Sequence, residues 1–302
     1  MSNVFPIIFS IVILFILGIL LKSTTLLKRD DADVLLKIVF YISLPALILN
    51  TIPTVDINLT FFFLPILSSI IIIITFLVSS LVVNYQNFEE KTKGVFIIGT
   101  MIMNLGFNVP FVLGAYGVEG FARATFFDIG NITLTLSLTY FIAQKHGSLE
   151  GEEKIKFLNK KLITSPPLIA LIIGLILNFT GVSLDFNITY LLDLLSGLLT
   201  PLLILSIGIY FNPTLENIFP VTQVILIRMG LGLTLGVVFA LLLGLDDLSS
   251  KIIIISSAAP VGFNTLTYAA LEDLDKEFAA NILSIGIPLG IVTISLLLII
   301  LG

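Results

Sequence analysis

The sequence predicts an all-α membrane protein with ten transmembrane helices, arranged as two inverted repeats of five helices. Three observations lead to this prediction. Long apolar segments recur along the whole chain, separated mostly by short polar connectors. The connectors alternate between rich and poor in Lys and Arg. Two apolar segments in corresponding positions of the two halves are interrupted by Pro, Gly and Asn, as expected for broken helices 4 and 9.

Composition supports the membrane prediction and excludes several other classes. Of the 302 residues, 57% are apolar and 12% charged, and the mean hydropathy is +1.14, whereas soluble domains carry about 25% charged residues. There is no Cys and a single histidine, His146, so thiolate metal sites and Cys nucleophiles are excluded and no metal or cofactor is expected. The net charge of −5 and the lack of a basic block argue against a nucleic-acid partner.

Ten apolar runs are each close to the roughly 20 residues that a spanning helix needs. The N-terminal run is interpreted as the first span and not as a signal peptide, because no positive charge precedes it and no cleavage site follows it. The predicted spans are 4–21, 35–51, 60–84, 94–116, 121–143, 163–181, 188–210, 217–243, 251–270 and 279–301.

The distribution of basic residues predicts the orientation of the chain. The connectors at 52–59, 182–187 and 244–250 contain neither Lys nor Arg, and short loops that are rich in basic residues stay in the cytoplasm. Both termini are therefore predicted outside the cytoplasm, in a multi-pass protein of the plasma membrane. The predicted cytoplasmic residues are Lys22, Lys28, Arg29, Lys37, Lys91, Lys93, Lys145, Lys154, Lys156, Lys160, Lys161 and Lys276.

The longest connector, 144–162, predicts a cytoplasmic linker between a first repeat, 1–143, and a second repeat, 163–302. Five spans is an odd number, so the two halves have opposite orientations. Prolines match in order between the halves, although prolines that only kink helices for packing are an alternative explanation. The matched pairs are Pro6 with Pro166, Pro45 with Pro201, and Pro110 with Pro260.

The two interrupted spans predict a binding site at mid-membrane. Their sequences are "GTMIMNLGFNVPFVLGAYG" and "KIIIISSAAPVGFNTLTYAA", and unwound backbone in lipid requires protein or a water-filled cavity to satisfy its polar groups. Half-helix amino ends favour an anion, asparagine oxygens can instead hold a cation, and asparagines can also simply hydrogen-bond neighbouring helices. We expect Pro110 to unwind span 4 against Pro260, and the predicted substrate-binding residues are Asn104, Asn108, Pro110, Pro260, Gly262, Asn264 and Thr265.

Five segments together resemble the auxin efflux carrier family in its compact prokaryotic form. They are "FYISLPALILNTI", "NLGFNVPFVLGAYGVEGFARATFFDIGN", "SPPLIALIIGLILN", "LLTPLLILSIGIYF" and "SSAAPVGFNTLTYAALEDLDKEFAANILSIGIPL". The resemblance implies a fold like those of bile-acid symporters and sodium/proton antiporters. It also implies a scaffold domain from helices 1, 2, 6 and 7, a transport domain from the others, and helices 4 and 9 that cross at Pro110 and Pro260.

The same resemblance implies the substrate class. Members of the family carry small organic acids, including auxin in plants and dicarboxylates such as malate or malonate in bacteria, and the fold suggests a homodimer. The chain departs from many relatives at Asn108, where they often have glycine, so the polarity of the site is expected to differ.

Charged residues at bilayer depth are functional candidates. Asp128 and Asn131 are predicted to bind a coupling proton or sodium ion, with capping of unwound span 4 backbone by Asp128 as the alternative. Arg228 is a weaker candidate for binding a substrate carboxylate, because the implied fold places span 8 away from the crossing; pairing with a protein carboxylate or carbonyl, or snorkelling towards the cytoplasm, are the alternatives. Glu272, in the connector after span 9, is interpreted as part of a solvated loop.

These features favour a secondary transporter of a small organic anion that works by alternating access. A cation antiporter or symporter of the same fold is the alternative, although it would be expected to have adjacent carboxylates at the crossing. No nucleotide-binding loop is present, and the chain lacks the paired aspartates, Ser/His pair or metal cluster of an intramembrane enzyme. A structural or receptor role would leave the matched breaks unexplained.

Overall fold

A computed structural model describes residues 4–147, 165–213 and 218–302. The described residues form helices and no strand beyond one isolated bridge. The α-helices are α1 (Val4–Ser23), α2 (Arg29–Ile38), α3 (Leu44–Thr51), α4 (Leu59–Asn84), α5 (Glu90–Met101), α6 (Leu105–Leu134), α7 (Tyr140–His146), α9 (Pro166–Thr180), α10 (Phe186–Ser196), α11 (Leu199–Tyr210), α12 (Ile218–Ile225), α13 (Gly232–Leu242), α14 (Asp247–Ser257), α15 (Asn264–Leu271) and α16 (Lys276–Leu301). Wider π-helical turns are η1 (Val39–Ser43), η3 (Thr135–Thr139) and η4 (Leu226–Leu231), and η2 (Ile52–Thr54) is a 3₁₀ turn.

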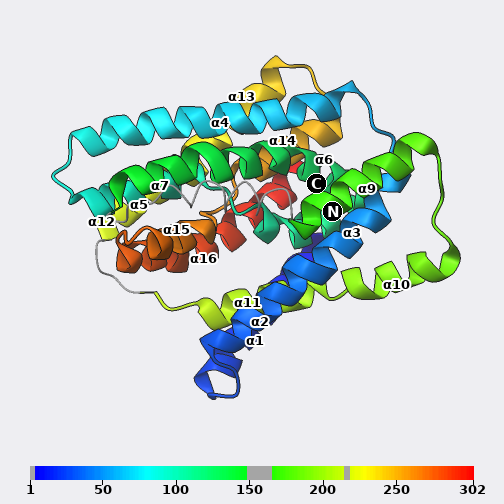
Figure 1. The fold of residues 1–302 in the computed structure, drawn as a ribbon, viewed down its shortest axis with the longest axis horizontal. Coiled ribbons are helices and arrows are strands. Elements are labelled where there is room, and N and C mark those ends of the chain that lie inside the picture. The colour runs from blue at the N-terminus through cyan, green and yellow to red at the C-terminus, as the bar shows by residue number, and fades with distance from the viewer. Residues whose placement is uncertain (1–3, 148–164, 214–217) are drawn as a thin grey trace. The chain divides into compact units, whose positions relative to one another are not determined.

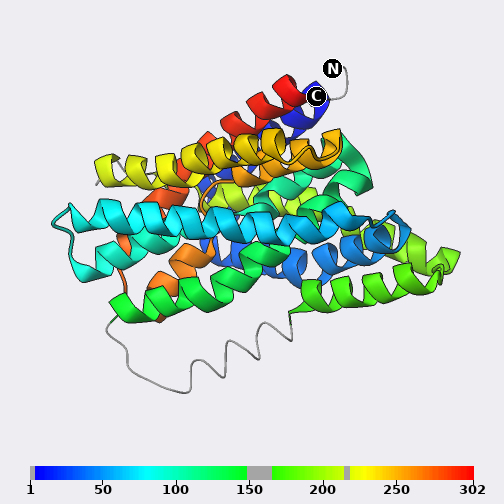
Figure 2. The same ribbon diagram turned by 90° about the horizontal axis from the view of Figure 1, so that it is seen from above.

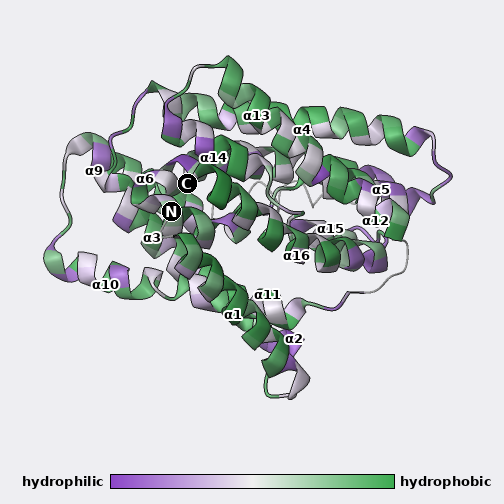
Figure 3. Cartoon of the chain, turned by 180° about the vertical axis from the view of Figure 1, so that it is seen from behind, coloured by the Kyte–Doolittle hydropathy of each residue, from purple (hydrophilic) through white to green (hydrophobic). Residues whose placement is uncertain are grey.

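The prediction of an all-α, multi-pass membrane protein is confirmed. Seven helical segments within the described ranges are long and apolar enough to cross a membrane, and hydrophobic residues run along helices such as α1, α4 and α13 (Figure 3). The predicted linker at 144–162 lies outside the described residues from position 148 onward, as do the first residues of the spans predicted at 163–181 and 217–243.

The length of a segment explains why seven are found where ten are predicted. The predicted spans 94–116 and 251–270 are each interrupted, so α5, α14 and α15 are individually too short, and α9 is an apolar helix of only 15 residues. In α6 the helical path turns at Gly117, whose φ of 62° is in the left-handed region that glycine tolerates. The number of spans and their inverted arrangement therefore stay predictions.

The chain divides into two compact units. Unit 1 comprises the described residues within 1–57, 109–122 and 152–211. In this unit α1 packs along α11 (Figure 1), and α3 packs against α9 and α10. Asn178 of α9 donates hydrogen bonds to the carbonyls of Ile52 and Val55, at 2.9 and 2.8 Å, and so satisfies backbone groups where α3 ends.

Unit 2 comprises the described residues within 58–108, 123–151 and 212–302. The long helix α4 packs against α5 and α13, as Figure 2 allows the reader to follow, and α13 packs along α14. Helix α5 also contacts α7, α12, α15 and α16. The interruptions of both broken spans lie in unit 2, so the site can be described within this unit alone.

Candidate functional site: the crossing of two interrupted helices

The first interruption separates α5 from α6 at Ile102–Asn104. Ile102 is extended, with φ −81° and ψ 115°, and Asn104 caps the new helix, since its Oδ1 accepts a hydrogen bond from the Phe107 amide at 3.2 Å. The second interruption, Ala258–Phe263, separates α14 from α15. Both segments are thus interrupted as predicted, and we call Ile102–Asn104 together with Ala258–Phe263 the crossing.

The two interruptions satisfy each other's backbone. The amide of Asn104 donates to the carbonyl of Pro260 at 2.8 Å, and the amide of Gly262 donates to the carbonyl of Ile102 at 3.0 Å. Met103 and Val261 form the isolated antiparallel bridge between them. Unpaired backbone groups at bilayer depth cost several kcal/mol each. By pairing such groups, this short bridge stabilises both interruptions.

Gly262 and Gly290 make the close approach at the crossing feasible. A Cβ at Gly262 would lie 2.6 Å from Cγ2 of Ile102, and one at Gly290 of α16 would lie 2.8 Å from the ring of Pro260. A side chain at either position would force the backbone segments apart. Gly262, predicted as a substrate-binding residue, therefore has a packing role in the crossing.

The prediction that span 4 unwinds at Pro110 is wrong. The interruption comes earlier, at Ile102–Asn104, and Pro110 lies inside α6. The physical reason is that the Asn104 cap and the bridge to Pro260 fix where α6 begins, whereas Pro110 only removes one amide from an already formed helix. Pro260, by contrast, lies in the interruption of span 9 as predicted.

Asn131 of α6 forms hydrogen bonds with both the backbone amide and the backbone carbonyl of the unwound residue Met103. Its Oδ1 accepts from the Met103 amide at 3.2 Å, and its Nδ2 donates to the Met103 carbonyl at 3.2 Å. The same Nδ2 donates to Oδ1 of Asp128 at 2.8 Å. Capping of unwound backbone, the alternative role predicted for Asp128, is therefore performed by Asn131. Asp128 accepts a hydrogen bond from the side-chain amide of Asn131 and so helps to orient it.

Arg228 reaches the helix ends that lead into the crossing, contrary to the expectation that its span lies too far away. Its Nη1 donates to the carbonyl of Thr100 at 3.2 Å and its Nη2 to the carbonyl of Ser257 at 2.9 Å. These carbonyls lie in the last turns of α5 and α14, whose final C=O groups have no partner within the helix. The residue lies in the π-helical turn η4, and such wide turns are frequent at functional sites.

Four buried polar atoms next to the crossing make no hydrogen bond within the described part of the chain. Asn104 is 9% exposed and Asn108 1% exposed. The second polar atom of each side-chain amide does form a hydrogen bond: Oδ1 of Asn104 accepts from the Phe107 amide, and Nδ2 of Asn108 donates to the Ile255 carbonyl at 3.0 Å. Because buried polar atoms in proteins normally have a partner, the four atoms are available for a ligand or water. They are Asn104 Nδ2, Asn108 Oδ1, Ser256 Oγ and Thr265 Oγ1.

The remaining predicted site residue, Asn264, is placed differently. It begins α15 and its side chain is exposed, whereas its neighbour Thr265 is buried. The predicted site residues did not include Ser256, and Arg228 was only a weaker candidate for binding a carboxylate. The serine pair before Pro260 was visible in the sequence as a polar signal, whereas the contact of Arg228 with α5 and α14 was not.

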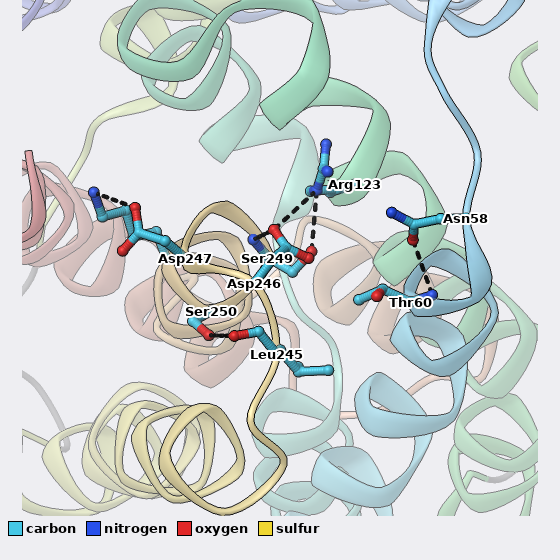
Figure 4. A network of polar contacts seen from close by, with 9 residues as sticks. Asn58, Thr60, Arg123, Leu245, Asp246, Asp247, Ser249 and Ser250 are labelled. Carbon is cyan, nitrogen blue, oxygen red and sulfur yellow. Dashed lines mark hydrogen bonds and ion pairs between the residues drawn. The ribbon is translucent and has the colours of Figure 1, made fainter.

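A polar network fixes the first turn of α14 (Figure 4). Nε of Arg123 donates to Oγ of Ser249 at 3.0 Å and lies 3.8 Å from Oδ1 of Asp246, while its guanidinium stacks over the ring of Phe61. Partial burial opposes ionisation of Asp246, but the hydrogen bonds from Ser249 and the charge of Arg123 outweigh it and hold the pKa of Asp246 below its ordinary value. The network anchors α14 to α4 and α6.

A second network fixes the first turn of α5 to the loop between α15 and α16. Lys91 pairs with Asp273 at 2.5 Å, and Oγ1 of Thr92 donates to Asp275 at 2.8 Å. Glu272 is fully buried and accepts a hydrogen bond from the Tyr140 hydroxyl at 2.6 Å. The interpretation of Glu272 as part of a solvated loop is therefore wrong, since its burial is stabilised by this contact.

Comparison with known proteins identifies the family. A family model described as membrane transport protein matches residues 3–298. The chain belongs to this family of membrane transport proteins. The match confirms the resemblance to the auxin efflux carriers, and it confirms that this membrane transport protein is a transporter and not an enzyme. No group of His, Cys, Asp and Glu suited to a metal ion occurs among the described residues.

Two archaeal relatives are similar to this membrane transport protein over nearly their whole length. An uncharacterized transporter of Methanocaldococcus jannaschii is 28% identical over 297 residues, which cover 95% of each chain. An uncharacterized transporter of Methanothermobacter thermautotrophicus is 25% identical over 293 residues, again with 95% of each chain covered.

Proposed function

We propose that this protein is a secondary transporter of a small organic anion, a carboxylate, and that it works by alternating access around the crossing. The proposal includes ten transmembrane helices in two inverted repeats, 1–143 and 163–302, in the plasma membrane with both termini outside the cytoplasm. A homodimer is part of the same proposal. Membership of a membrane transport family supports the general class.

The observation that carries the proposal is the set of buried, unsatisfied polar atoms next to the crossing, of which those of Asn104 and Thr265 lie at the amino ends of α6 and α15. Asn104 Nδ2 can donate a hydrogen bond, and the hydroxyls of Ser256 and Thr265 can donate or accept one. Helices α6 and α15 begin at the crossing, and helix amino ends carry a partial positive charge. Hydrogen-bond donors at positive helix ends match the oxygens of a carboxylate.

A ligand screen tests the proposal. We expect at least one carboxylate of a panel containing malate, malonate and indole-3-acetate to raise the apparent melting temperature of the purified protein, because a ligand that binds only the folded state stabilises it. The chain has no Trp and no Cys, so melting is followed by circular dichroism, with and without sodium at two pH values. A labelled carboxylate that binds should then enter proteoliposomes faster than empty liposomes; uptake at the rate of empty liposomes for the whole panel would contradict the proposal.

Coupling to a cation is the second part of the proposal, and Asp128 is its candidate. One carboxylate oxygen accepts the hydrogen bond from Asn131, and among the described residues no Lys, Arg or His pairs with Asp128. A carboxylate at bilayer depth with no cationic partner is suited to take up a proton or a sodium ion. A cation antiporter or symporter of the same fold would use the same residue.

Asp128→Asn should remove the dependence of uptake on a pH or sodium gradient while keeping the hydrogen bond to Asn131. Uptake would then be measured in proteoliposomes with and without each gradient, and we expect the gradient to raise the rate of the wild-type protein but not of the variant. Thr133→Asn, at an exposed position of the same helix, serves as the control. A variant that responds to the gradient as the wild type does would leave Asp128 with only its supporting role beside Asn131.

A further inference from the structure

Arg228 is a buried positive charge that the proposed transport cycle does not yet use. Its side chain is fully buried, with 0% exposure. Its two Nη atoms donate to the carbonyls of Thr100 and Ser257, and its Nε has no hydrogen-bond partner in the described part of the chain. Within that part, no carboxylate lies at ion-pair distance from the guanidinium.

The surroundings of the guanidinium are shaped to hold it. Gly232, one turn after Arg228, lies against the hydrogen bond between Arg228 and Ser257. A Cβ there would be 2.5 Å from Nη2 of Arg228 and 2.3 Å from the carbonyl oxygen of Ser257. A side chain at Gly236 would likewise collide with Ser257, its Cβ lying 2.7 Å from Oγ. Helix α13 therefore packs closely against α14, with Nη2 of Arg228 held beside the Ser257 carbonyl.

The position of the charge decides the electrostatics of the crossing. Thr100 and Ser257 belong to the carboxyl ends of α5 and α14, each of which carries about half a negative charge from its helix dipole. A guanidinium bonded to both ends offsets them. The amino ends of α6 and α15, which carry the opposite partial charge, are then no longer balanced by the carboxyl ends beside them.

Keeping a charge in this place is costly, because an arginine without a carboxylate partner loses its hydration on burial. Neutral donors can satisfy backbone carbonyls, as Asn108 does for Ile255 and Asn131 for Met103. Among the described residues, the carboxylate linked to the crossing is Asp128, which is joined through Asn131 to Met103 and not to Arg228. The electrostatic effect of Arg228 thus differs from that of the neutral caps around it.

We propose that Arg228 is a positioning residue that makes the crossing select an anion over a neutral molecule of the same shape. It acts through the carbonyls of Thr100 and Ser257, whose negative helix ends it offsets, and does not itself contact the substrate. This inference rests on the proposed function, because it specifies the charge of the ligand that the site accepts.

The test compares a carboxylate with its neutral amide. The probes are malonate with malonamide and indole-3-acetate with indole-3-acetamide, and their dissociation constants are measured with the purified wild-type protein, Arg228→Lys and Arg228→Gln. We expect wild type to bind one of the carboxylates at least tenfold more tightly than its amide. Arg228→Gln should lose most of that preference, and Arg228→Lys, which keeps the charge, should retain it within about threefold.

The lysine variant separates an electrostatic role from a structural one. Both substitutions remove the bridge between two carbonyls, so both should lower the melting temperature, whereas only the glutamine variant should lose the preference for the anion. Arg123→Gln is the matched control, since Arg123 is bonded to Ser249 at the start of α14 and not to the two carbonyls; it should keep the preference.

Each outcome has a distinct meaning. Suppose that the wild type binds a carboxylate and that Arg228→Gln prefers it over the amide as strongly as the wild type does. That result, or an equal loss of the preference in both Arg228 variants, would overturn the role of Arg228 and leave the proposed function in place. If neither Arg228 variant folds, the wild-type protein still decides: carboxylate and amide bound equally well would overturn the inference. Wild type that binds no member of the panel would refute the proposed function, and the inference with it.

Discussion

Gly208→Ala is expected to destabilise unit 1 by about 1–3 kcal/mol or more, even though alanine is the better helix former. Gly208 of α11 lies against α1, and a Cβ there would be 2.3 Å from the carbonyl oxygen of Phe15 and 2.9 Å from Cα of Gly18. Both of these are backbone atoms, so no side chain can rotate away. The two helices would have to separate, and their packing along one another would be lost.

Small residues that let backbones approach are a general basis of helix packing in membranes, because apolar side chains gain little from leaving lipid. The matched control is Gly230→Ala, since a Cβ at Gly230 would meet no atom within 4 Å. Thermal unfolding by circular dichroism in one detergent compares the variants. If Gly208→Ala melts at the temperature of Gly230→Ala, the close approach of α1 and α11 does not stabilise the protein.

The broken spans illustrate how far the sequence could predict the site. Clustered Asn, Gly and Pro in two matching segments were enough to place an interruption in each, because those residues are unfavourable in a continuous helix in lipid. The residue at which the first helix breaks could not be predicted from Pro110. It depends on hydrogen bonds from Asn131 and to Pro260, which come from residues distant in the sequence.

Arg228 shows the same limit for a charged residue. A lone arginine in an apolar span is visible in the sequence, but its partners are backbone carbonyls of Thr100 and Ser257, and carbonyls carry no sequence signature. The burial of Glu272 could not be predicted for a related reason. Its hydrogen-bond partner, Tyr140 of α7, is distant in the sequence. Periodicity and composition indicate which segments enter the membrane, whereas long-range polar contacts decide which charged side chains can be buried.

The two ends of the interrupted helices are held by different kinds of group. A neutral amide binds the unwound backbone itself, as Asn131 does for Met103, whereas the carboxyl end of α14 receives both the neutral amide of Asn108, at Ile255, and the charged guanidinium of Arg228, at Ser257. Ion pairs and hydrogen bonds fix the outer turns of α5 and α14. A crossing that is anchored at both ends and in the middle can keep its geometry while a ligand binds, which is the condition for discriminating between similar substrates.

Asn131→Leu is expected to lower the stability of unit 2 by about 2–5 kcal/mol. Leucine has a similar size, but it cannot form the hydrogen bonds that asparagine makes with the amide and the carbonyl of Met103. Each buried group left without a partner costs about 1–3 kcal/mol. Asn131→Asp keeps an acceptor for the Met103 amide, loses the donor, and places a second carboxylate beside Asp128, so it should also be destabilised. Thr133→Leu is the control on the exposed face of the same helix, where the threonine hydroxyl bonds only its own helix backbone. Melting by circular dichroism and sodium dependence of ligand binding are measured on the same samples. A variant Asn131→Leu that melts like the wild type but no longer responds to sodium would make Asn131 an ion ligand and not the brace of the first interruption.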